Sequence, residues 1–306
     1  MKSNPGKRTL IVITGPTAVG KTACAIEIAR TLDTVILSAD SRQFYKELSI
    51  GTAKPSSEEL ALVSHYFIGN LSIHDYYNIS RFETDVLSLL DTLFRDHSTV
   101  ILAGGSGLYI DAVCKGIDNF PDPEPELRAY LKGILADEGI EKLRDLLRLH
   151  DPAYLLEVDQ SNPNRMLRAL EVCLSTGIPF SSQRLNQARK RDFNVIRIGL
   201  NLPRAELFDR INRRVDQMIE NGLLEETRGL LPFRHLNALN TVGYKELFEY
   251  FDGLVSLDQA IGNIRTNTRR YAKRQLTWFR RDEDITWFEP GQTREILNWI
   301  ESQPKE

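Results

Sequence analysis

The residues best suited to chemistry form a loop near the start of the chain, GPTAVGKT at 15–22. Its glycines, lysine and threonine fit the pattern G-x-x-x-x-G-K-[ST], in which backbone N–H groups and the lysine bind phosphate oxygens and the hydroxyl binds Mg²⁺. The pattern needs a strand before it and a helix after it, and LIVIT and ACAIEIAR meet both requirements. The alternative interpretation is a glycine-rich turn that only joins a strand to a helix. We predict a phosphate-binding loop made of Gly15, Pro16, Thr17, Ala18, Val19, Gly20, Lys21 and Thr22, with Thr22 as the metal ligand.

The carboxylate that would accompany this loop in a kinase or ATPase is missing from its usual place. Those enzymes end a further apolar strand with an aspartate that holds the metal, whereas TVILAGGSGLY runs directly into Gly104, Gly105, Ser106 and Gly107. An acid stands instead at Asp40, in VILSADSRQFY, just past the second predicted strand. Open α/β sheets bind their ligands at this end of the strands. A phosphate cradle without the usual metal acid indicates a pyrophosphate that is held as a leaving group.

Short apolar runs separated by helix-length segments must position these residues. TLIVIT, TVILSA, TVILAGG and NVIRIGL have the composition and spacing of strands in a parallel βαβ sheet, and DITWFE is a further possible strand. Between the third and fourth runs the spacing is helical, and the proline- and glycine-containing stretches FPDPEP and STGIPFSS bound this segment. We predict an α/β fold, a P-loop NTPase-like parallel sheet flanked by helices, with an inserted all-helical domain. The expected domains are 1–119, the first part of the core; 120–190, the helical insertion; and 191–306, the mainly helical remainder of the core.

Composition limits the partners and the compartment. The chain has 306 residues, 42% of them hydrophobic, and a formal net charge of −3, so any nucleic-acid contact needs locally gathered positive charge. Cys24, Cys114 and Cys173 are isolated, without a CxxC pair or a histidine cluster, which indicates reduced and mostly buried thiols. The apolar stretch after the basic N-terminus is too short for a secretion signal or a membrane span. We therefore expect a cytoplasmic protein without a membrane partner, and a monomer.

Seven stretches occur in one order along almost the whole chain: GPTAVGKT, SADSRQFY, IGTAKPS, AGGSGLY, NRMLRALE, NTVGYKEL and RRYAKRQLTWFR. In that order they resemble the tRNA dimethylallyltransferases, also called tRNA isopentenyltransferases. The resemblance implies transfer of a dimethylallyl group from dimethylallyl pyrophosphate to N6 of the adenosine 3′ of the tRNA anticodon, which gives N6-isopentenyladenosine and pyrophosphate. It also implies Mg²⁺ as cofactor and a helical insertion that contacts tRNA.

Two positions depart from the family's pattern. Ser106 stands where relatives often have a threonine, which keeps the hydroxyl. HYFIG stands where relatives often have HHLID, so that the second histidine is Tyr66. We therefore assign no catalytic role to the HYFIG stretch.

The implied reaction gives the acid and the cations distinct roles. An adenine amino group that attacks an allylic carbon must lose a proton, and Asp40 is the predicted general base; its alternatives are a turn cap or a metal ligand. Departing pyrophosphate gathers negative charge, which Lys21 and Thr22 would stabilise. In AELFDRINRRVDQMIENGLLEE, helical spacing places Arg214 at the border of the apolar stripe with Arg210 beside it. The resemblance implies a diphosphate contact for Arg214; the alternative for both arginines is extension to solvent. The predicted catalytic residues are Asp40, Lys21, Thr22 and Arg214, and Arg214 and Arg210 complete the predicted diphosphate site.

Positive charge is concentrated from Gln259 to Arg281, a segment without Asp or Glu. Tyr271, Gln275 and Trp278 recur at helical spacing, which predicts a helix with one inward face and a basic outer face. The outer face would bind RNA phosphates; a solvated helix surface is the alternative.

The adenosine must leave its stacked position in the anticodon loop to reach a carboxylate. The resemblance implies that Ser106 contacts this adenosine, with a simple helix cap as the alternative, and that residues 161–170 touch the anticodon loop. We expect Ser41, Arg42 and Gln43 to contact the base or its neighbours, and Gln43 or Arg42 to read an adjoining base. The predicted tRNA-binding residues are Asp40, Ser41, Arg42, Gln43, Ser106, Asn164, Arg165, Met166, Leu167, Arg168, Arg269, Lys273 and Arg274.

Three other functions remain open at this point. A small-molecule or nucleotide kinase explains the phosphate loop but leaves the basic segment without a role. A prenyltransferase that acts on free AMP or ADP keeps the same pocket and needs no tRNA. An RNA-binding module with a nucleotide-responsive loop would make Asp40 dispensable.

Overall fold

The computed structural model describes residues 8–118, 120–122, 124–184 and 188–303. The chain forms two compact units: Met1–Cys114 together with Arg191–Glu306, and Lys115–Lys190. The first is built on a sheet and is here called the core unit; the second is here called the helical unit. The helical unit begins at Lys115, where a helix of the core unit ends, rather than at residue 120, where prolines begin to interrupt the sequence.

The core unit contains a six-stranded sheet in the order β3-β2-β4-β1-β5-β6, and all neighbouring strands are parallel. Its strands are β1 (Thr9–Thr14), β2 (Ile36–Ser38), β3 (His65–Tyr66), β4 (Thr99–Ala103), β5 (Asn194–Leu200) and β6 (Thr286–Phe288). The five runs predicted as strands all form strands. The addition is β3, because two residues show no periodicity in a sequence.

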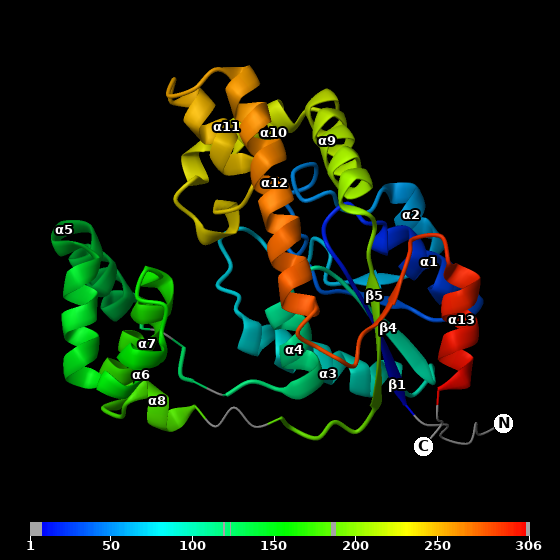
Figure 1. Ribbon diagram of the computed structural model, residues 1–306, viewed down its shortest axis with the longest axis horizontal. Coiled ribbons are helices and arrows are strands. Elements are labelled where there is room, and N and C mark those ends of the chain that lie inside the picture. Colours follow the sequence, from blue (N-terminus) through cyan, green and yellow to red (C-terminus); the bar gives the residue numbers. More distant parts are fainter. Residues whose placement is uncertain (1–7, 119, 123, 185–187, 304–306) are drawn as a thin grey trace. The chain divides into compact units, whose positions relative to one another are not determined.

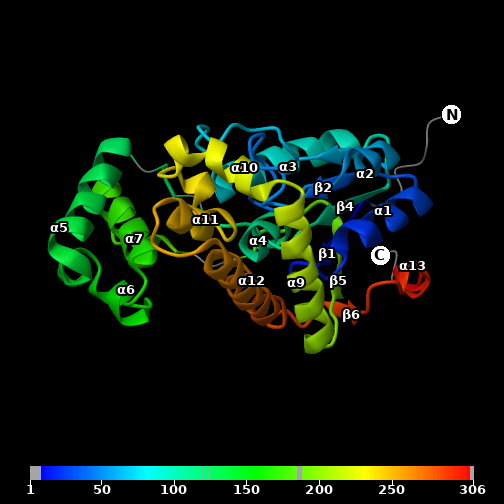
Figure 2. The same ribbon diagram turned by 90° about the horizontal axis from the view of Figure 1, so that it is seen from above.

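Helices cover both faces of this sheet, as a parallel sheet requires (Figures 1 and 2). Leu10 and Val12 of β1 pack into one cluster with α3 and α4, whereas Ile11 and Ile13 pack into another with α1, α9 and α13. The alternation follows from the two-residue period of a strand. These helices are α1 (Lys21–Thr31), α3 (Ile79–Leu93), α4 (Gly107–Lys115), α9 (Arg204–Glu220) and α13 (Thr293–Ser302), and α2 (Ser57–Leu62) follows the second strand.

The chain after β5 adds a helical layer to the core unit. It consists of α9, α10 (Leu223–Gly229), the 3₁₀ turns Leu231–Phe233 and Asn237–Leu239, α11 (Tyr244–Phe251) and α12 (Leu257–Phe279). Tyr244 and Leu247 are fully buried in the cluster that joins these helices. A capping box of Ser256 and Gln259 starts α12, and α12 packs beside α9 (Figures 1 and 2). The most basic segment of the sequence is thus one long helix.

The helical unit has its own apolar core and no strand among its described residues, in agreement with the predicted insertion. Its helices are α5 (Pro125–His150), α6 (Pro152–Glu157), α7 (Pro163–Thr176) and α8 (Phe180–Gln183). Leu143 and Leu147 of α5 pack against Met166 and Leu170 of α7. The fully buried Asp151 caps α6 through the Tyr154 N–H, and it also accepts hydrogen bonds from the backbone and hydroxyl of Ser181.

All three cysteines are free and buried, as their isolation in the sequence predicts. In Cys24, burial raises the pKa of the thiol to about 12, so that it stays protonated near neutral pH. Among the described helices, none combines the length and the apolar character needed to cross a lipid bilayer.

Candidate active site

The phosphate loop lies between the end of β1 and the start of α1, at the carboxyl edge of the sheet. Lys21 Nζ donates to the carbonyl oxygens of Gly15 at 3.0 Å and Pro16 at 2.8 Å, so the lysine folds back over the loop. A Cβ on Gly15 would lie 2.5 Å from the carbonyl oxygen of Leu200, which makes glycine necessary where the loop passes β5. Because α1 begins at Lys21, N–H groups of its first turn have no partner within the helix and can bind an anion.

Three charged groups meet beside this loop: Asp40, Lys21 and Arg214. Burial lowers the pKa of Lys21 to about 8, an effect that Asp40 opposes and Arg214 increases. Burial also lowers the pKa of Arg214, and Asp40 again opposes it. Charges influence one another in this way only over short distances. The predicted base, which follows β2, thus acts on the charges of the predicted diphosphate cations on α1 and α9.

The arginines of α9 are arranged as helical spacing predicts. Arg214 Nη1 donates to Thr17 Oγ1 at 3.3 Å, and Arg210 Nη1 donates to the carbonyl oxygen of Val19 at 3.4 Å. Arg213 points away and pairs with the exposed Asp209 at 2.7 Å. Arg210 also pairs with Glu206 at 2.9 Å, so its charge is shared between an acid and the backbone of the loop. Arg214, which pairs with no acid in this way among the described residues, keeps its charge for a ligand.

The loop after β2 holds Asp40 in a turn next to Ser106. The Asp40 carboxylate accepts the Arg42 N–H at 3.0 Å, so it does cap the turn, as the alternative interpretation proposes; its second oxygen is left for other partners. Ser106 Oγ accepts the Ser41 N–H at 3.0 Å and donates to Ser41 Oγ at 3.2 Å. The N–H of Ser106 donates to the Ala39 carbonyl at 3.2 Å. The two predicted adenosine contacts, Ser41 and Ser106, are thus neighbours beside the predicted base.

Arg42 and Gln43 are both engaged within the protein. The Arg42 guanidinium donates to the carbonyl oxygens of Asn237, Ala238 and Asn240, at 2.9, 3.2 and 3.4 Å. The Gln43 amide donates to Thr52 and Ala53 carbonyls and accepts from Ser38. Both side chains therefore shape the loop, and reading a base would require them to exchange existing hydrogen bonds.

A carboxylate on α10 holds the neighbouring loop in place, and no pattern in the sequence predicted this contact. Glu226 of α10 accepts the N–H groups of Ser49, Ile50 and Gly51, at 3.1, 2.8 and 3.0 Å, and also the hydroxyl of Tyr244 at 2.6 Å. Gly51 packs directly against the Tyr244 ring. The stretches IGTAKPS and NTVGYKEL thus contact each other in the fold. The sequence shows only their order along the chain and does not reveal this contact.

The inward face of α12 includes Gln275 and, in part, Trp278, as predicted, but not Tyr271. Its buried residues include Ala272, Gln275 and Phe279, whereas Tyr271 is 36% exposed and Trp278 is intermediate. Ala272 and Phe279, one position after Tyr271 and Trp278, are buried, whereas Gln275 is buried as predicted. Burial raises the pKa of Tyr271, and the charge of Asp40 raises it further, so the predicted base acts on this edge of α12.

The basic side chains of α12 and of the two arginines that follow it, Arg280 and Arg281, are directed to rings and solvent more than to acids. Arg269 lies over the ring of Phe208, Arg274 over that of Tyr271 and Arg281 over that of Trp278, with guanidinium-to-centroid distances of 5.7, 5.8 and 4.0 Å. Lys273 and Arg280 are exposed. Arg265 is the exception, since it forms an ion pair with Asp216.

The predicted tRNA contacts in the helical unit divide by exposure. Asn164 and Arg165 are exposed at the start of α7, but Met166 and Leu167 are buried in the core of the unit, 0% and 7% exposed. Their side chains hold α7 in place and are not available to RNA. Arg168 is half-buried and donates to the Pro121 carbonyl at 3.1 Å and to Glu171 at 3.4 Å. Of these predicted tRNA contacts, only Asn164 and Arg165 are therefore exposed to RNA.

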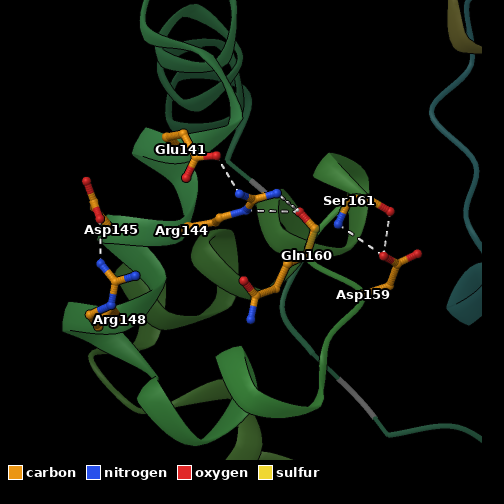
Figure 3. A network of polar contacts seen from close by, with 7 residues as sticks. All are labelled: Glu141, Arg144, Asp145, Arg148, Asp159, Gln160 and Ser161. Carbon is orange, nitrogen blue, oxygen red and sulfur yellow. Dashed lines mark hydrogen bonds and ion pairs between the residues drawn. The ribbon is translucent and has the colours of Figure 1, made fainter.

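Other arginines of the helical unit are neutralised locally (Figure 3). Arg144 pairs with Glu141 at 2.5 Å and donates to the Gln160 carbonyl, and Arg148 pairs with Asp145 at 2.5 Å (Figure 3). Both pairs join residues one turn apart on α5. They give this face of the helix little net charge.

Comparisons with known proteins agree with this geometry. A sequence profile of the family described as IPP transferase matches residues 43–282. The chain is 52% identical over 294 residues to tRNA dimethylallyltransferase 1 of Phocaeicola vulgatus, and the match covers 96% of this chain and 98% of that protein. The tRNA dimethylallyltransferase of Christiangramia forsetii is 52% identical over 296 residues, with the same coverage of 96% and 98%.

Solved structures give the same result. The full-length tRNA isopentenylpyrophosphate transferase of Bacillus halodurans superposes with a TM-score of 0.71 at 36% identity, over 96% of both chains. A eukaryotic dimethylallyltransferase acting on tRNA superposes with a TM-score of 0.79 at 25% identity, over 97% of this chain and 80% of that one. The likeness thus covers the sheet, the phosphate loop and the helices that surround them. By profile, sequence and structure, the chain belongs to the tRNA dimethylallyltransferase family of IPP transferases.

Proposed function

We propose that this protein transfers the dimethylallyl group of dimethylallyl pyrophosphate to N6 of the adenosine 3′ of the tRNA anticodon. One observation carries the proposal for this chain: hydrogen bonds to Gly15, Pro16 and Thr17 hold Lys21 and Arg214 at a phosphate loop, and the Asp40 carboxylate opposes the lowering of the pKa of both cations by burial. A kinase needs its acid on the metal, whereas alkylation of an amine needs it at the nucleophile. Family membership provides the independent support.

The reaction balances with the groups at hand. The N6 lone pair forms a bond to the allylic carbon while the bond from that carbon to the diphosphate oxygen breaks, and the diphosphate leaves with the electron pair. The nitrogen passes a proton to the free oxygen of Asp40. Lys21, Arg214 and the N–H groups at the start of α1 stabilise the charge that grows on the leaving group, more in the transition state than in the bound donor.

The proposed RNA contacts follow from charge and exposure. The anticodon loop would lie along the exposed basic edge of α12, where Lys273 and Arg274 are free of acids on their own helix. Burial raises the pKa of Tyr271 on this edge, and the charge of Asp40 adds to the effect. The target adenosine leaves the stack and enters between Ser41, Ser106 and Asp40, and extrusion of one nucleotide costs a few kcal/mol. Arg165 is the exposed cation at the start of α7 that serves the proposed second contact.

The side chains near the phosphate loop suit a magnesium ion whose ligands come mainly from the substrate. No cluster of three or more acidic, histidine or cysteine side chains able to hold a metal occurs among the described residues. Mg²⁺ typically takes one or two protein oxygens and completes its shell with phosphate oxygens and water. Thr22, half-buried in the first turn of α1, would supply a hydroxyl oxygen. When bound, the ion would neutralise part of the diphosphate charge.

We also propose that the protein acts as a monomer in the cytoplasm. The proposed site draws its residues from β1, β2, β4, α1, α9 and α12 of one chain, so no second copy is needed to complete it. Sedimentation of the purified protein at micromolar concentration tests the monomer: a single species of about 35 kDa is expected from the mass of 34.9 kDa.

The decisive experiment offers the purified protein labelled dimethylallyl pyrophosphate with Mg²⁺ and one of three acceptors: unmodified tRNA, AMP or buffer. Label recovered in tRNA alone, on the adenosine 3′ of the anticodon, is the expected result. Label in AMP would replace tRNA by a free nucleotide as substrate. Consumption of ATP in a parallel reaction, with no transfer of label, would establish a kinase and overturn the proposal.

A further inference from the structure

A buried amide joins the phosphate loop to the basic helix. Gln275, in α12, is 6% exposed. Its Oε1 accepts the Thr17 N–H at 2.8 Å, and its Nε2 donates to the Gly105 carbonyl at 2.9 Å. Thr17 belongs to the phosphate loop after β1, and Gly105 to the turn after β4. One side chain thus connects two loops at the carboxyl edge of the sheet.

The surroundings of this amide are shaped to admit it. A Cβ on Gly105 would collide with Gln275 Nε2, and a Cβ on Gly107 would collide with the Trp278 ring. Glycine at both positions therefore allows α12 to approach the turn after β4. The partners also fix the amide's orientation, because the Thr17 N–H can only donate and the Gly105 carbonyl can only accept.

Thr17 connects this amide to the predicted diphosphate cation. Its N–H is held by Gln275, and its hydroxyl accepts from Arg214 at 3.3 Å. The N–H of Thr17 therefore points toward α12 and is not one of the donors that face an anion. Displacement of α12 would move Thr17 and so alter the loop and Arg214 together.

The same helix carries the exposed cations. Lys273 and Arg274 are exposed and immediately precede Gln275 in the chain, whereas Gln275 faces the phosphate loop. A ligand on the exposed face of α12 and a diphosphate in the loop therefore act on opposite faces of one helical turn. Two sites that bias the same element are thermodynamically coupled, and the coupling is reciprocal.

We propose that Gln275 is a positioning residue that couples RNA on α12 to diphosphate in the phosphate loop, so that each ligand binds more tightly when the other is present. The proposal rests on the proposed function for the identity of the two ligands. Its content is separate from catalysis, because it concerns the equilibrium binding of pyrophosphate and RNA.

The test measures binding of inorganic pyrophosphate with Mg²⁺ by calorimetry, with and without an unmodified anticodon stem-loop RNA. Gln275→Met keeps the length of the side chain and removes both hydrogen bonds; Gln275→Glu keeps the acceptor for Thr17 and removes the donor for Gly105. Gln217→Met makes the same change at an exposed position of α9 and is the matched control.

For the natural sequence and the control, we expect RNA to tighten pyrophosphate binding by a measurable factor, about fivefold or more. Both Gln275 variants should lose most of this factor, and pyrophosphate binding without RNA should weaken about tenfold, as loss of buried hydrogen bonds predicts. Binding of RNA alone should change less than about twofold, since the cations remain.

Thermal melting establishes that each variant is folded, and Gln275→Glu provides the result if Gln275→Met is not. A coupling factor that is unchanged in a folded variant, or absent in the natural sequence, would overturn the inference. Loss of coupling together with failure of the natural protein to transfer label to tRNA would support the inference and refute the proposed function, so the two failures are distinguishable.

Discussion

Two regions of this protein are rich in arginine, and their charges are arranged differently. In the helical unit five arginines pair with acids: Arg128 and Arg168 with Glu171, Arg144 with Glu141, Arg148 with Asp145, and Arg184 with Glu157. In α12 and the two residues after it, Arg269, Arg274 and Arg281 lie over aromatic rings, and among the described residues only Arg265 pairs with an acid. An arginine over a ring adds its full positive charge to the surface, whereas an arginine beside a carboxylate forms a pair with little net charge. The number of basic residues is therefore a poor guide to where RNA binds.

The largest expected effect is on the rate of transfer. It tests whether the chemical step depends on a residue outside both arginine-rich regions. Asp40→Ala should lower the rate of transfer by about 10²- to 10⁴-fold, because the amine loses its proton acceptor. Binding of tRNA should change less than about threefold, since the cations of α12 and the helical unit are untouched. Single-turnover rates and filter binding measure the two quantities. Transfer at the normal rate would remove Asp40 as the base.

The second test compares the two arginine-rich regions directly. Replacing Lys273 and Arg274 by Ala should weaken tRNA binding about tenfold or more and lower the slope of log affinity against log salt by about 1.4 to 1.8, because two phosphate contacts are lost. The matched variant replaces Arg144 and Arg148 by Ala, both paired with acids on α5. It should change affinity less than about twofold. Equal effects of the two variants would refute the difference between the regions.

The third test uses pH to separate diphosphate binding by Lys21 from RNA binding by the arginines of α12. Below pH 8, Lys21 is protonated and is expected to bind diphosphate. Above pH 8, Lys21 loses its charge, because burial has lowered its pKa to about 8. Pyrophosphate affinity should therefore fall as pH rises from 7 to 9, and binding should take up protons near pH 8. RNA binding by the arginines of α12 should stay constant over this range. Lys21→Arg should bind with little pH dependence, and a similar decline in that variant would assign the titration to another group.

The smallest expected effect distinguishes the roles of the two arginines of α7, one in RNA binding and the other in stability. Arg165 is exposed, so Arg165→Ala should weaken tRNA binding about threefold and leave stability unchanged. Arg168 contacts the buried Glu171, so Arg168→Ala should lower the free energy of unfolding by about 1 kcal/mol and affect RNA less. Thermal melting and filter binding on the same samples check both. The reverse order would place Arg168 in the RNA contact.

Local patterns were sufficient for most of the fold. The strands of a parallel sheet covered on both faces are continuous apolar runs, so β1, β4 and β5 could be predicted directly. The helical spacing of α9 was enough to separate Arg214 and Arg210 from Arg213. These patterns depend on residues within one or two turns of each other, so they can be recognised from the sequence alone.

Contacts between distant segments were not accessible in this way. Gln275 and Thr17 are 258 positions apart, and Arg42 is 195 positions from Asn237. The sequence places Gln275 on an inward face but does not say what it contacts. Tyr271 was misplaced for a local reason, since Ala272 carries too little apolar surface to mark the buried stripe. Met166 and Leu167 belong to a stretch chosen by resemblance, and their burial depends on packing against α5.

The central claim is that Asp40 faces the reacting amine while the phosphate loop holds the leaving group. A crystal structure with an unreactive thio-analogue of dimethylallyl pyrophosphate and an anticodon stem-loop tests it most directly. We expect the diphosphate against residues 15–22 and Arg214, and the adenosine N6 about 3 Å from an oxygen of Asp40. An adenosine that remains stacked in the RNA, or an allylic tail directed away from Asp40, would contradict the account.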